Sequence, residues 1–587
     1  MLHRRERHHR RQPDRGRPLL HRRQYADRQE HAGSADVYLR PRGALSDGKR
    51  RLPEIHPTHA TGRPMTLPPL FALFADAARR HPEKTALIIG PRRLTYAELA
   101  ASVEHLAAHW QAAGVRAGDH VGVVAPNGVP FVQLMLAAAR LGVVLVPQPL
   151  GAPADALLRA FDTTGVRHLA VWHGLLAGAD MLSALERIDG VRVSIGGDAP
   201  PPGWHRFESW LEPAACPATP PHPAPGATHP FLMVLTSGST GQPKPIVLHQ
   251  EVKIARARAA IGLYGLDAND CILAATPLYH SLAQRLVIVP LMLGATSVVM
   301  EHFSPALWCA AIAEHRCSFT IAVSSQLKQA LPELARQAHD LGSLKRIVSS
   351  SALLDGPTKA ALLGALRCDF HECYGTSEIA TATDLHAQSD AHKLGSVGRP
   401  VPGAEIRILD PQGQFAPVDQ AGEIVCRTPL AFNGYFDQPE LTEAAYHQGF
   451  FRTGDLGRLD ADGYLYYEGR LKDIVITGGI NIYPRDIEDV LKAAPGVHDC
   501  AVIAVEDDRL GEVVGAVLAT GGQGTIDLRA VQRLCAQRLN DAQQPRHYFL
   551  VSELPLNAMG KVDKQAMRRS FSSKPAPAQP APPAESG

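Results

Sequence analysis

Residues 236–244 read Thr-Ser-Gly-Ser-Thr-Gly-Gln-Pro-Lys, and this stretch carries the prediction of the fold. Its two glycines, Gly238 and Gly241, leave the backbone free to wrap around an anion, and Lys244 adds a positive charge. The spacing differs from that of the Walker loop, because Lys244 follows a proline rather than a glycine. We therefore expect a loop that binds a polyphosphate. Its hydroxyl donors are Thr236, Ser237, Ser239 and Thr240.

The flanks of this loop predict strands rather than a helix. Residues 231–235 and 246–248 are short apolar runs rich in β-branched side chains. A loop between two strands has no helix N-terminus beneath it, so side chains and flexible backbone must hold the phosphates. The alternative is a surface hairpin rich in Gly, Ser and Thr.

Bulk composition indicates a globular protein of more than one domain. The chain has 587 residues, of which 45% are hydrophobic and 20% charged. The apolar run at 286–293 is far too short to span a membrane. The nine cysteines are scattered without a C-x-x-C pair or a metal-type spacing. We expect a reduced, cytoplasmic compartment and no cysteine catalysis.

The first 64 residues form a basic extension, with 16 Lys and Arg against 7 Asp and Glu. A basic arm can bind nucleic acid or an acidic membrane surface. This one lacks apolar periodicity, the apolar core of a secretion signal and the acid-poor composition of a transit peptide. We expect a disordered segment with an assigned start that is too early, and translation from Met65.

The region after Met65 alternates between helical and strand patterns. Thr95 and Glu98 form a capping box ahead of a helix, and apolar runs at 121–124, 143–146 and 271–275 read as buried strands. This pattern predicts an α/β fold with stacked, largely parallel sheets. Further strands of this kind are predicted at 297–300 and 320–323.

Composition also predicts where the domains divide. Residues 401–470 carry many turns and short alternating strands, which indicates a β-rich subdomain. We expect a large N-terminal domain over 65–470 and a small, mobile α+β C-terminal domain over 471–570. Residues 571–587 are rich in Pro, Ala and Ser and are expected to be disordered.

Three further motifs follow the loop in order: Tyr-Gly-Thr-Ser-Glu at 374–378, Phe-Arg-Thr-Gly-Asp at 451–455 with Gly-Arg-Leu-Lys-Asp at 469–473, and Pro-Leu-Asn-Ala-Met-Gly-Lys at 555–561. With the loop, they resemble the signatures of the adenylate-forming superfamily, which comprises acyl- and aryl-CoA ligases, peptide-synthetase adenylation domains and luciferases. Taken singly, each motif can also be a simple turn or a solvated surface charge.

The resemblance implies a role for each motif residue. The ring of Tyr374 would stack on adenine, Ser377 would contact the α-phosphate, and Glu378 would ligate Mg²⁺. Asp455 would accept both ribose hydroxyls with Arg470 beside it, and Lys561 would bridge the carboxylate and the α-phosphate. Gly375, Thr376 and the loop residues Thr236, Ser237, Gly238, Ser239, Thr240, Gly241 and Lys244 complete the implied nucleotide site.

The resemblance also implies a hinge, a thiol channel and an acid pocket. Lys472 matches the hinge of the C-terminal domain, and Gly478 and Gly479 match the segment that leaves room for the pantetheine arm. Serines at 349–351, where the family usually has glycines, would narrow or polarise the pocket. Tyr279 and His280 match an aromatic-His segment without the Asp of amino-acid-activating domains. The implied pocket residues are Tyr279, His280, Ser324, Ser350 and Ser351, with His280 and Thr236 also among the catalytic positions.

These features predict an ATP-dependent acid–CoA ligase of fatty or aromatic acid metabolism, using ATP, Mg²⁺ and CoA. One alternative is an enzyme that loads the acid onto the phosphopantetheine arm of a carrier protein. A second is a nucleotide-binding regulator without catalysis. We expect no nucleic-acid partner and no membrane span. Arg285, in an apolar stretch, is expected to extend to solvent, or else to meet a second polar group of the acid.

Overall fold

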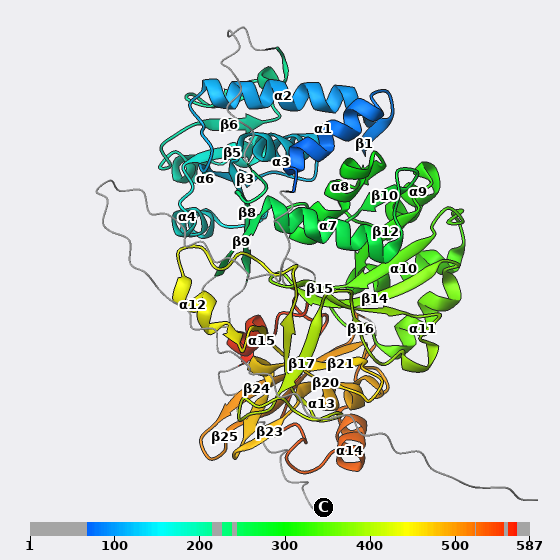
Figure 1. Cartoon of the computed structure of the whole chain (residues 1–587). Helices are drawn as coiled ribbons and strands as arrows, with labels where there is room; N and C mark the ends of the chain where they lie inside the picture. Colours follow the sequence, from blue (N-terminus) through cyan, green and yellow to red (C-terminus); the bar gives the residue numbers. More distant parts are fainter. Residues whose placement is uncertain (1–66, 214–225, 237–243, 523, 557–560, 572–587) are drawn as a thin grey trace, which may run out of the picture. The chain divides into compact units, whose positions relative to one another are not determined.

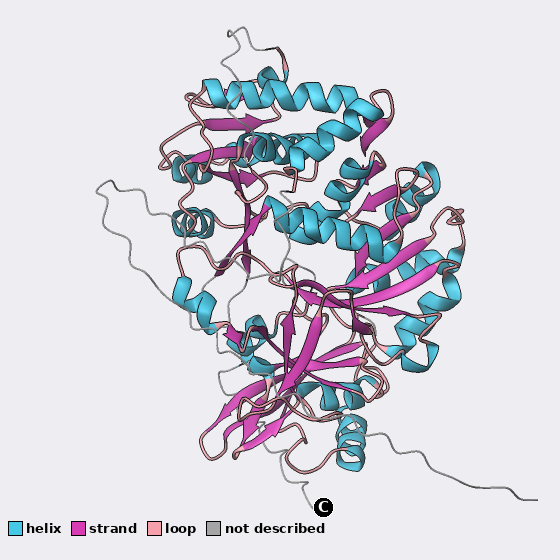
Figure 2. Ribbon diagram, in the orientation of Figure 1, coloured by secondary structure: helices cyan, strands magenta, loops and turns pink. Residues whose placement is uncertain are grey.

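The computed structural model describes residues 67–213, 226–236, 244–522, 524–556 and 561–571. These residues form four β-sheets with helices packed on them (Figures 1 and 2). Two sheets are α/β, one is antiparallel, and one belongs to the C-terminal part of the chain. The predicted start at Met65 and the predicted terminal segments, 1–64 and most of 571–587, lie outside the described residues.

The first α/β sheet has seven strands in the order β7-β6-β5-β3-β4-β8-β9. Its strands run parallel except for the last pair, β8 and β9, which is antiparallel and flanks the predicted phosphate loop. Its strands and the helices that follow along the chain are β3 (His120–Val124), α3 (Val129–Leu141), β4 (Val144–Pro147), α4 (Ala154–Thr163), β5 (His168–Trp172), α5 (His173–Leu176), α6 (Ala179–Leu185), β6 (Arg192–Ile195), β7 (His205–Arg206), η1 (Glu208–Leu211), β8 (Pro230–Thr236) and β9 (Lys244–His249).

The second α/β sheet has nine strands in the order β16-β15-β14-β13-β12-β10-β11-β1-β2. The six strands from β14 to β1 are parallel, and antiparallel strands close both edges. The elements are α1 (Leu70–Arg80), β1 (Thr85–Ile89), β2 (Arg92–Thr95), α2 (Tyr96–Ala112), α7 (Gln250–Tyr264), β10 (Cys271–Ala274), α8 (Ser281–Leu293), β11 (Thr296–Val299), α9 (Pro305–His315), β12 (Phe319–Val323), α10 (Ser324–Arg336), β13 (Arg346–Ser350), α11 (Gly356–Ala365), β14 (Asp369–Thr376), β15 (Ala380–His386), η2 (Ala391–Lys393) and β16 (Arg399–Pro400).

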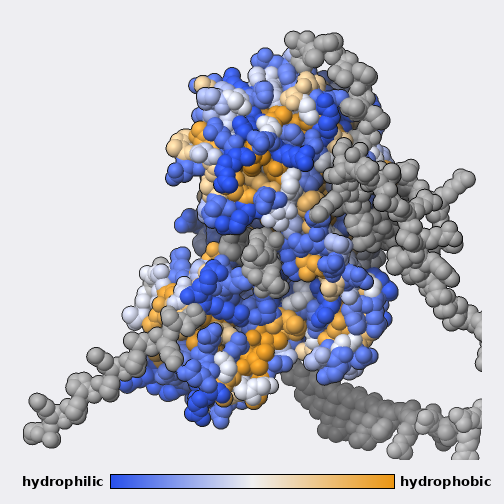
Figure 3. All heavy atoms as spheres, turned by 90° about the vertical axis from the view of Figure 1, so that its left-hand side faces the viewer, coloured by the Kyte–Doolittle hydropathy of each residue, from blue (hydrophilic) through white to orange (hydrophobic). Residues whose placement is uncertain are grey.

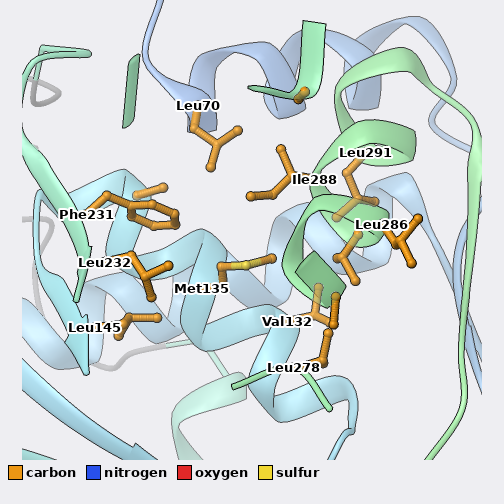
Figure 4. Packing of buried hydrophobic residues seen from close by; sticks show 14 of the residues in the cluster. Leu70, Val132, Met135, Leu145, Phe231, Leu232, Leu278, Leu286, Ile288 and Leu291 are labelled. Carbon is orange, nitrogen blue, oxygen red and sulfur yellow. The ribbon is translucent and has the colours of Figure 1, made fainter. Parts of the chain in front are cut away.

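One hydrophobic core joins these two sheets. Helix α3 is buried along most of its length, and Met135 on it lies between Leu145 and Leu232 of the first sheet and Leu286 of α8 (Figure 4). An apolar side chain contributes about 1.5–3 kcal/mol when fully buried, so this shared core holds the two sheets together. The predicted capping box is confirmed: the hydroxyl of Thr95 accepts from the backbone N–H of Glu98 at the start of α2.

The third and fourth sheets follow in sequence. The third is an all-antiparallel sheet that agrees with the predicted β-rich subdomain. The fourth carries its own core, with Val502, Val514 and Leu491 buried in it. The elements are β17 (Glu405–Leu409), β18 (Gly422–Arg427), α12 (Pro439–Ala444), β19 (Tyr446–His447), β20 (Phe450–Leu459) and β21 (Leu465–Arg470), then η3 (Leu471–Asp473), β22 (Val475–Thr477), β23 (Ile480–Ile482), α13 (Pro484–Lys492), β24 (Asp499–Asp507), β25 (Gly511–Ala519), α14 (Leu528–Arg538), β26 (His547–Val551) and α15 (Lys564–Phe571).

The surface of the described part is mixed in polarity. Figure 3 shows one face on which hydrophilic residues surround smaller groups of hydrophobic ones. Among the helices of the described residues, none combines the length and the apolar character that crossing a bilayer requires. Exposed apolar side chains include Ile476 and Ile480 on the β22–β23 hairpin, and Leu510 beside it.

Candidate active site

The predicted phosphate loop connects two paired strands, as its flanks indicated. Thr236 ends β8 and lies opposite Lys244, the first residue of β9. The Lys244 ammonium lies 5.4 Å from the centre of the Tyr435 ring. The loop between them, 237–243, lies outside the described residues, and with it the predicted positions Ser237, Gly238, Ser239, Thr240 and Gly241.

The Tyr-Gly-Thr-Ser-Glu motif forms the end of β14 and the turn into β15. Gly375 is required there, because a Cβ atom would lie 1.7 Å from the carbonyl oxygen of Ala380 on the paired strand. Tyr374 is buried, and its hydroxyl donates to Oδ2 of Asp455 at 2.9 Å. The hydroxyl oxygen of Thr376 is buried and has no hydrogen-bond partner among the described residues.

Asp455 and Arg470 face each other across two antiparallel strands, β20 and β21. Oδ1 of Asp455 lies 3.0 Å from Nε of Arg470, and this neighbouring carboxylate raises the pKa of the guanidinium. The contact lacks the alignment of a hydrogen bond, so among the described residues Oδ1 has no hydrogen-bond donor. One oxygen of a buried carboxylate therefore remains able to accept from a ligand.

Arg256 of α7 holds the backbone that carries Glu378. Its guanidinium donates to the carbonyl oxygens of Ser377, Glu378 and Leu430 at 2.9–3.0 Å. Burial raises the pKa of the Tyr435 phenol, and the Glu378 carboxylate adds to that shift, which places this carboxylate beside Tyr435. In the described part of the chain, no group of three or more His, Cys, Asp or Glu side chains could hold a metal ion. Mg²⁺ commonly takes one or two carboxylates together with phosphate oxygens, and Glu378 offers one.

Lys561 joins this group from the C-terminal end of the chain. Burial, and then the charge of Arg470, lower the pKa of its ammonium to about 8, while Asp455 opposes the shift. The electrostatic environment of Asp455 includes Arg470, Lys561 and Glu378. The structure therefore brings together residues from three separate motifs of the sequence.

Family comparison accounts for this arrangement. Residues 74–436 match the AMP-binding enzyme family, and residues 486–561 match the C-terminal domain of AMP-binding enzymes. This chain belongs to the AMP-binding enzyme family. The predicted family is thereby confirmed. The predicted class of a large α/β N-terminal domain with a small C-terminal domain is confirmed by the likeness to solved structures, one of which is described below.

The matches of this chain to two curated relatives and to one solved structure extend over nearly the whole length of each of those proteins. An indoleacetate–CoA ligase from Aromatoleum aromaticum is 34% identical over 499 residues, which is 84% of this chain and 96% of the relative. A feruloyl-CoA synthase from Amycolatopsis sp. is 31% identical over 496 residues, 84% of this chain and 97% of the relative. ATP-bound MatB from Rhodopseudomonas palustris superposes with a TM-score of 0.77 at 27% identity, covering 86% of this chain and 99% of MatB.

In this AMP-binding enzyme, the predicted acid-pocket residues follow the carboxyl ends of neighbouring parallel strands. Tyr279 and His280 come after β10, Ser324 after β12, and Ser350 and Ser351 at the end of β13. Ligands in open α/β sheets bind at this edge. The ring centres of Tyr279 and His280 lie 4.1 Å apart. The hydroxyl of Ser324 donates to the carbonyl oxygens of Ser350 and Ala352.

The predicted hinge and thiol-channel residues belong to the start of the fourth sheet. Lys472 lies in η3, and its carbonyl oxygen accepts from Nη1 of Arg568 at 3.2 Å. Gly478 and Gly479 form the turn between β22 and β23 with φ of 55° and 85°, a backbone geometry that favours glycine. Their predicted roles and the predicted domain boundaries stay predictions.

A buried amide, Asn127, positions the predicted acid-pocket segment and was not predicted from the sequence. Asn127 donates from Nδ2 to the carbonyl oxygens of Thr276 and Met300 at 3.1 and 2.8 Å. Its Oδ1 accepts from the backbone N–H of Leu278 at 2.7 Å. The one sequence signal was a Pro-Asn-Gly turn directly after the predicted strand at 121–124. Such turns are common, so the signal is weak.

Arg285 is partly buried, and both interpretations of its role stay predictions. Its Nη1 donates to the hydroxyl of Thr381 on β15 at 3.0 Å, and burial lowers the pKa of its guanidinium. The apolar side chains that suggested a surface-reaching arginine belong to α8, which is packed into the core on that side. Arg285 points toward β14 and β15.

Proposed function

We propose that this chain is an AMP-forming acid–CoA ligase: it activates a carboxylic acid with ATP and transfers the acyl group to CoA. The observation that carries the proposal is the convergence of Tyr374, Asp455, Arg470, Glu378 and Lys561. This group combines an aromatic ring, a ribose-type acceptor, two cations and a metal-type carboxylate. Activation of a carboxylate by ATP needs this kind of positioning and charge compensation.

ATP fits two polar atoms of the site that have no hydrogen-bond partner among the described residues. Oδ1 of Asp455, which forms an ion pair with Arg470, can accept from a ribose hydroxyl, and the hydroxyl of Thr376 can donate to a phosphate oxygen. The loop 236–244 and Lys244 would hold the outer phosphates. Glu378 would hold Mg²⁺, and the bound ion would offset part of the charge on the phosphate oxygens.

The first half-reaction joins two anions. A carboxylate oxygen attacks the α-phosphorus of ATP, the bond to the bridging oxygen breaks, and pyrophosphate leaves with that electron pair. Both reactants are negatively charged, so a cation between them lowers the barrier. Lys561 is suited to this because it lies beside Asp455 and Arg470 and its pKa of about 8 leaves it mainly protonated at neutral pH.

The second half-reaction needs a different environment. The thiolate of CoA attacks the acyl carbon, and AMP leaves with the electron pair of the C–O bond. We propose that the domain over 471–570 turns about Lys472, which withdraws Lys561 and brings Gly478 and Gly479 to the pantetheine arm. A turn without side chains leaves space for a narrow thiol chain. The cytoplasm, where CoA and ATP are present, is the proposed compartment.

The decisive experiment measures pyrophosphate exchange and thioester formation. Purified protein with Mg²⁺ and ATP is given a library of acids, and acid-dependent exchange of labelled pyrophosphate into ATP is expected. Thioester is then measured with free CoA and, in parallel, with a holo-carrier protein. Transfer to the carrier protein alone would replace CoA as the acceptor. If no acid supports exchange, the chain is a nucleotide-binding regulator and the proposal fails.

A further inference from the structure

Three basic side chains lie together where α7 and α8 pack against β14 and β15. They are Lys253 and Arg256 of α7 and Arg285 of α8, and each lies within electrostatic range of the others. Among the described residues, none of the three forms an ion pair with a carboxylate. Burial holds the pKa of Lys253 well below its usual value, and the Glu378 carboxylate acts on Arg256, so the uncompensated charge of this group is that of Arg285.

The N–H donors of Lys253 and Arg256 are paired with neutral oxygens of the protein. Lys253 donates to the hydroxyl of Ser281 and to Oε1 of Gln284, both at 3.1 Å. The guanidinium of Arg256 donates to three backbone carbonyl oxygens. Arg285 differs, because a guanidinium has five N–H donors and the one hydrogen bond that it makes to a described residue goes to Thr381.

The unused donors of Arg285 keep accessible surface. The guanidinium is desolvated by burial but only partly buried, and the same holds for the thiol of Cys373 on β14. No Arg285 nitrogen is among the fully buried polar atoms of the described residues that lack a partner, so the nitrogens not bonded to Thr381 can donate to a bound group. Arg285 acts on Cys373, whose thiol lies beside Ser350 of the predicted acid pocket.

The nearby protein carboxylate is already occupied. Asp384 accepts from the hydroxyl of Tyr264 at 3.2 Å and lies 2.7 Å from Nδ1 of His371. Both of its oxygens are thus paired with other side chains. A guanidinium cannot release its proton in a protein, so it cannot relieve the missing charge by titration.

The second cationic centre of the site is separate from this one. The charges that act on Lys561 are those of Arg470 and Asp455, whereas the groups that act on Arg285 are Cys373 and Tyr264. The two cations have different neighbours, so a substrate with a second acidic group can engage Arg285 while its reacting carboxylate lies at Lys561.

We propose that Arg285 binds a second acidic group of the substrate, and that the preferred substrates are dianionic acids such as dicarboxylic or sulfocarboxylic acids. This inference rests on the proposed acid–CoA ligase function and names the substrate class of the same site. Planar guanidinium donors match carboxylate and sulfonate oxygens, and the serines at 349–351 suit a polar substrate better than a long alkyl chain.

The test compares each diacid with its own monomethyl ester. The probes are the linear α,ω-dicarboxylic acids from malonate to suberate, with the matching half-esters, in the pyrophosphate exchange assay. The ester keeps the length and one carboxylate but removes the second charge. For at least one chain length, we expect kcat/KM of the diacid to exceed that of its half-ester by about 10- to 100-fold, as for a desolvated charged hydrogen bond.

Variants assign the preference to Arg285. Arg285→Met is expected to lower kcat/KM for the preferred diacid by about 10- to 100-fold and to change that of the half-ester less than about threefold. Arg285→Lys keeps the charge and should retain part of the preference. Arg258→Met, an exposed cation on α7, is the matched control and should change neither value. In thermal unfolding without ATP, the diacid should stabilise wild type and not Arg285→Met.

The outcomes separate the inference from the function. Wild-type exchange with monoacids or half-esters that equals exchange with the diacids keeps the ligase and overturns the inference. Equal losses for both probes in Arg285→Met and in Arg285→Lys would make Arg285 a structural residue, which also overturns it. Absence of exchange with every acid refutes the ligase itself. If Arg285→Met fails to fold, the Arg285→Lys ratio and the wild-type ratio decide.

Discussion

The hydrogen bonds of Asn127 predict a specific order of stability among its variants. Asn127 makes three hydrogen bonds to backbone groups in a buried position. A net contribution of about 1 kcal/mol each gives a loss of about 3 kcal/mol in the free energy of unfolding for Asn127→Ala. Asn127→Asp has nearly the same shape, but its second oxygen would face the carbonyl oxygens of Thr276 and Met300. We expect that variant to lose about 4–5 kcal/mol, because two carbonyls lose their donor and oppose a buried charge.

Urea unfolding followed by circular dichroism at neutral pH measures these losses. Gln250→Leu is the control, since Gln250 is a buried amide that bonds the backbone of Leu70 and Ala139 in another part of the fold. It should lose about 2 kcal/mol for its two bonds while keeping the KM for the acid. The Asn127 variants should also raise the KM for the acid, because the hydrogen bond between Leu278 and Asn127 anchors the segment that carries His280.

Two results would refute this reasoning. Asn127→Asp as stable as wild type would mean that the amide nitrogen does not donate to the two carbonyls. An unchanged KM for the acid in both Asn127 variants, with stability lost, would mean that the segment at 276–280 does not line the acid pocket.

Three further predictions concern the nucleotide side of the site. Lys561→Ala should abolish adenylation while a synthetic acyl-adenylate is still converted to thioester; equal loss of both half-reactions contradicts its role. Because the pKa of Lys561 is about 8, the protonated form is lost as pH rises through that value, so kcat/KM for adenylation should fall above about pH 8, and the thioester step should lack this limb. Asp455→Ala should raise the KM for ATP at least about tenfold, as for loss of a hydrogen bond to a charged group, and an unchanged KM argues against the ribose contact. Arg256→Lys should raise the Mg²⁺ concentration needed for half-maximal exchange, because it releases the carbonyls of Ser377 and Glu378 and with them the backbone of the Mg²⁺ carboxylate. Circular dichroism is the control for folding.

Local patterns predicted the elements that depend on neighbouring residues. The strand–loop–strand at 230–249, the capping box of Thr95 and the β-rich stretch before residue 470 all appear in the structure. Each is decided by side chains a few positions apart, through alternation, capping or turn formation. The order and spacing of the motifs also predicted the family correctly.

Contacts between distant residues were decided by the tertiary structure. The Tyr374–Asp455 hydrogen bond spans 81 positions, and the three bonds of Asn127 span 149 to 173. The sequence did not decide whether Arg285 reaches solvent or meets the substrate, because an arginine in an apolar helix has the same sequence pattern in both cases. Its contact with Thr381, 96 positions away, and its partial burial are visible only in the tertiary structure. Sequence patterns report short-range order, whereas burial and charge compensation depend on which elements the fold brings side by side.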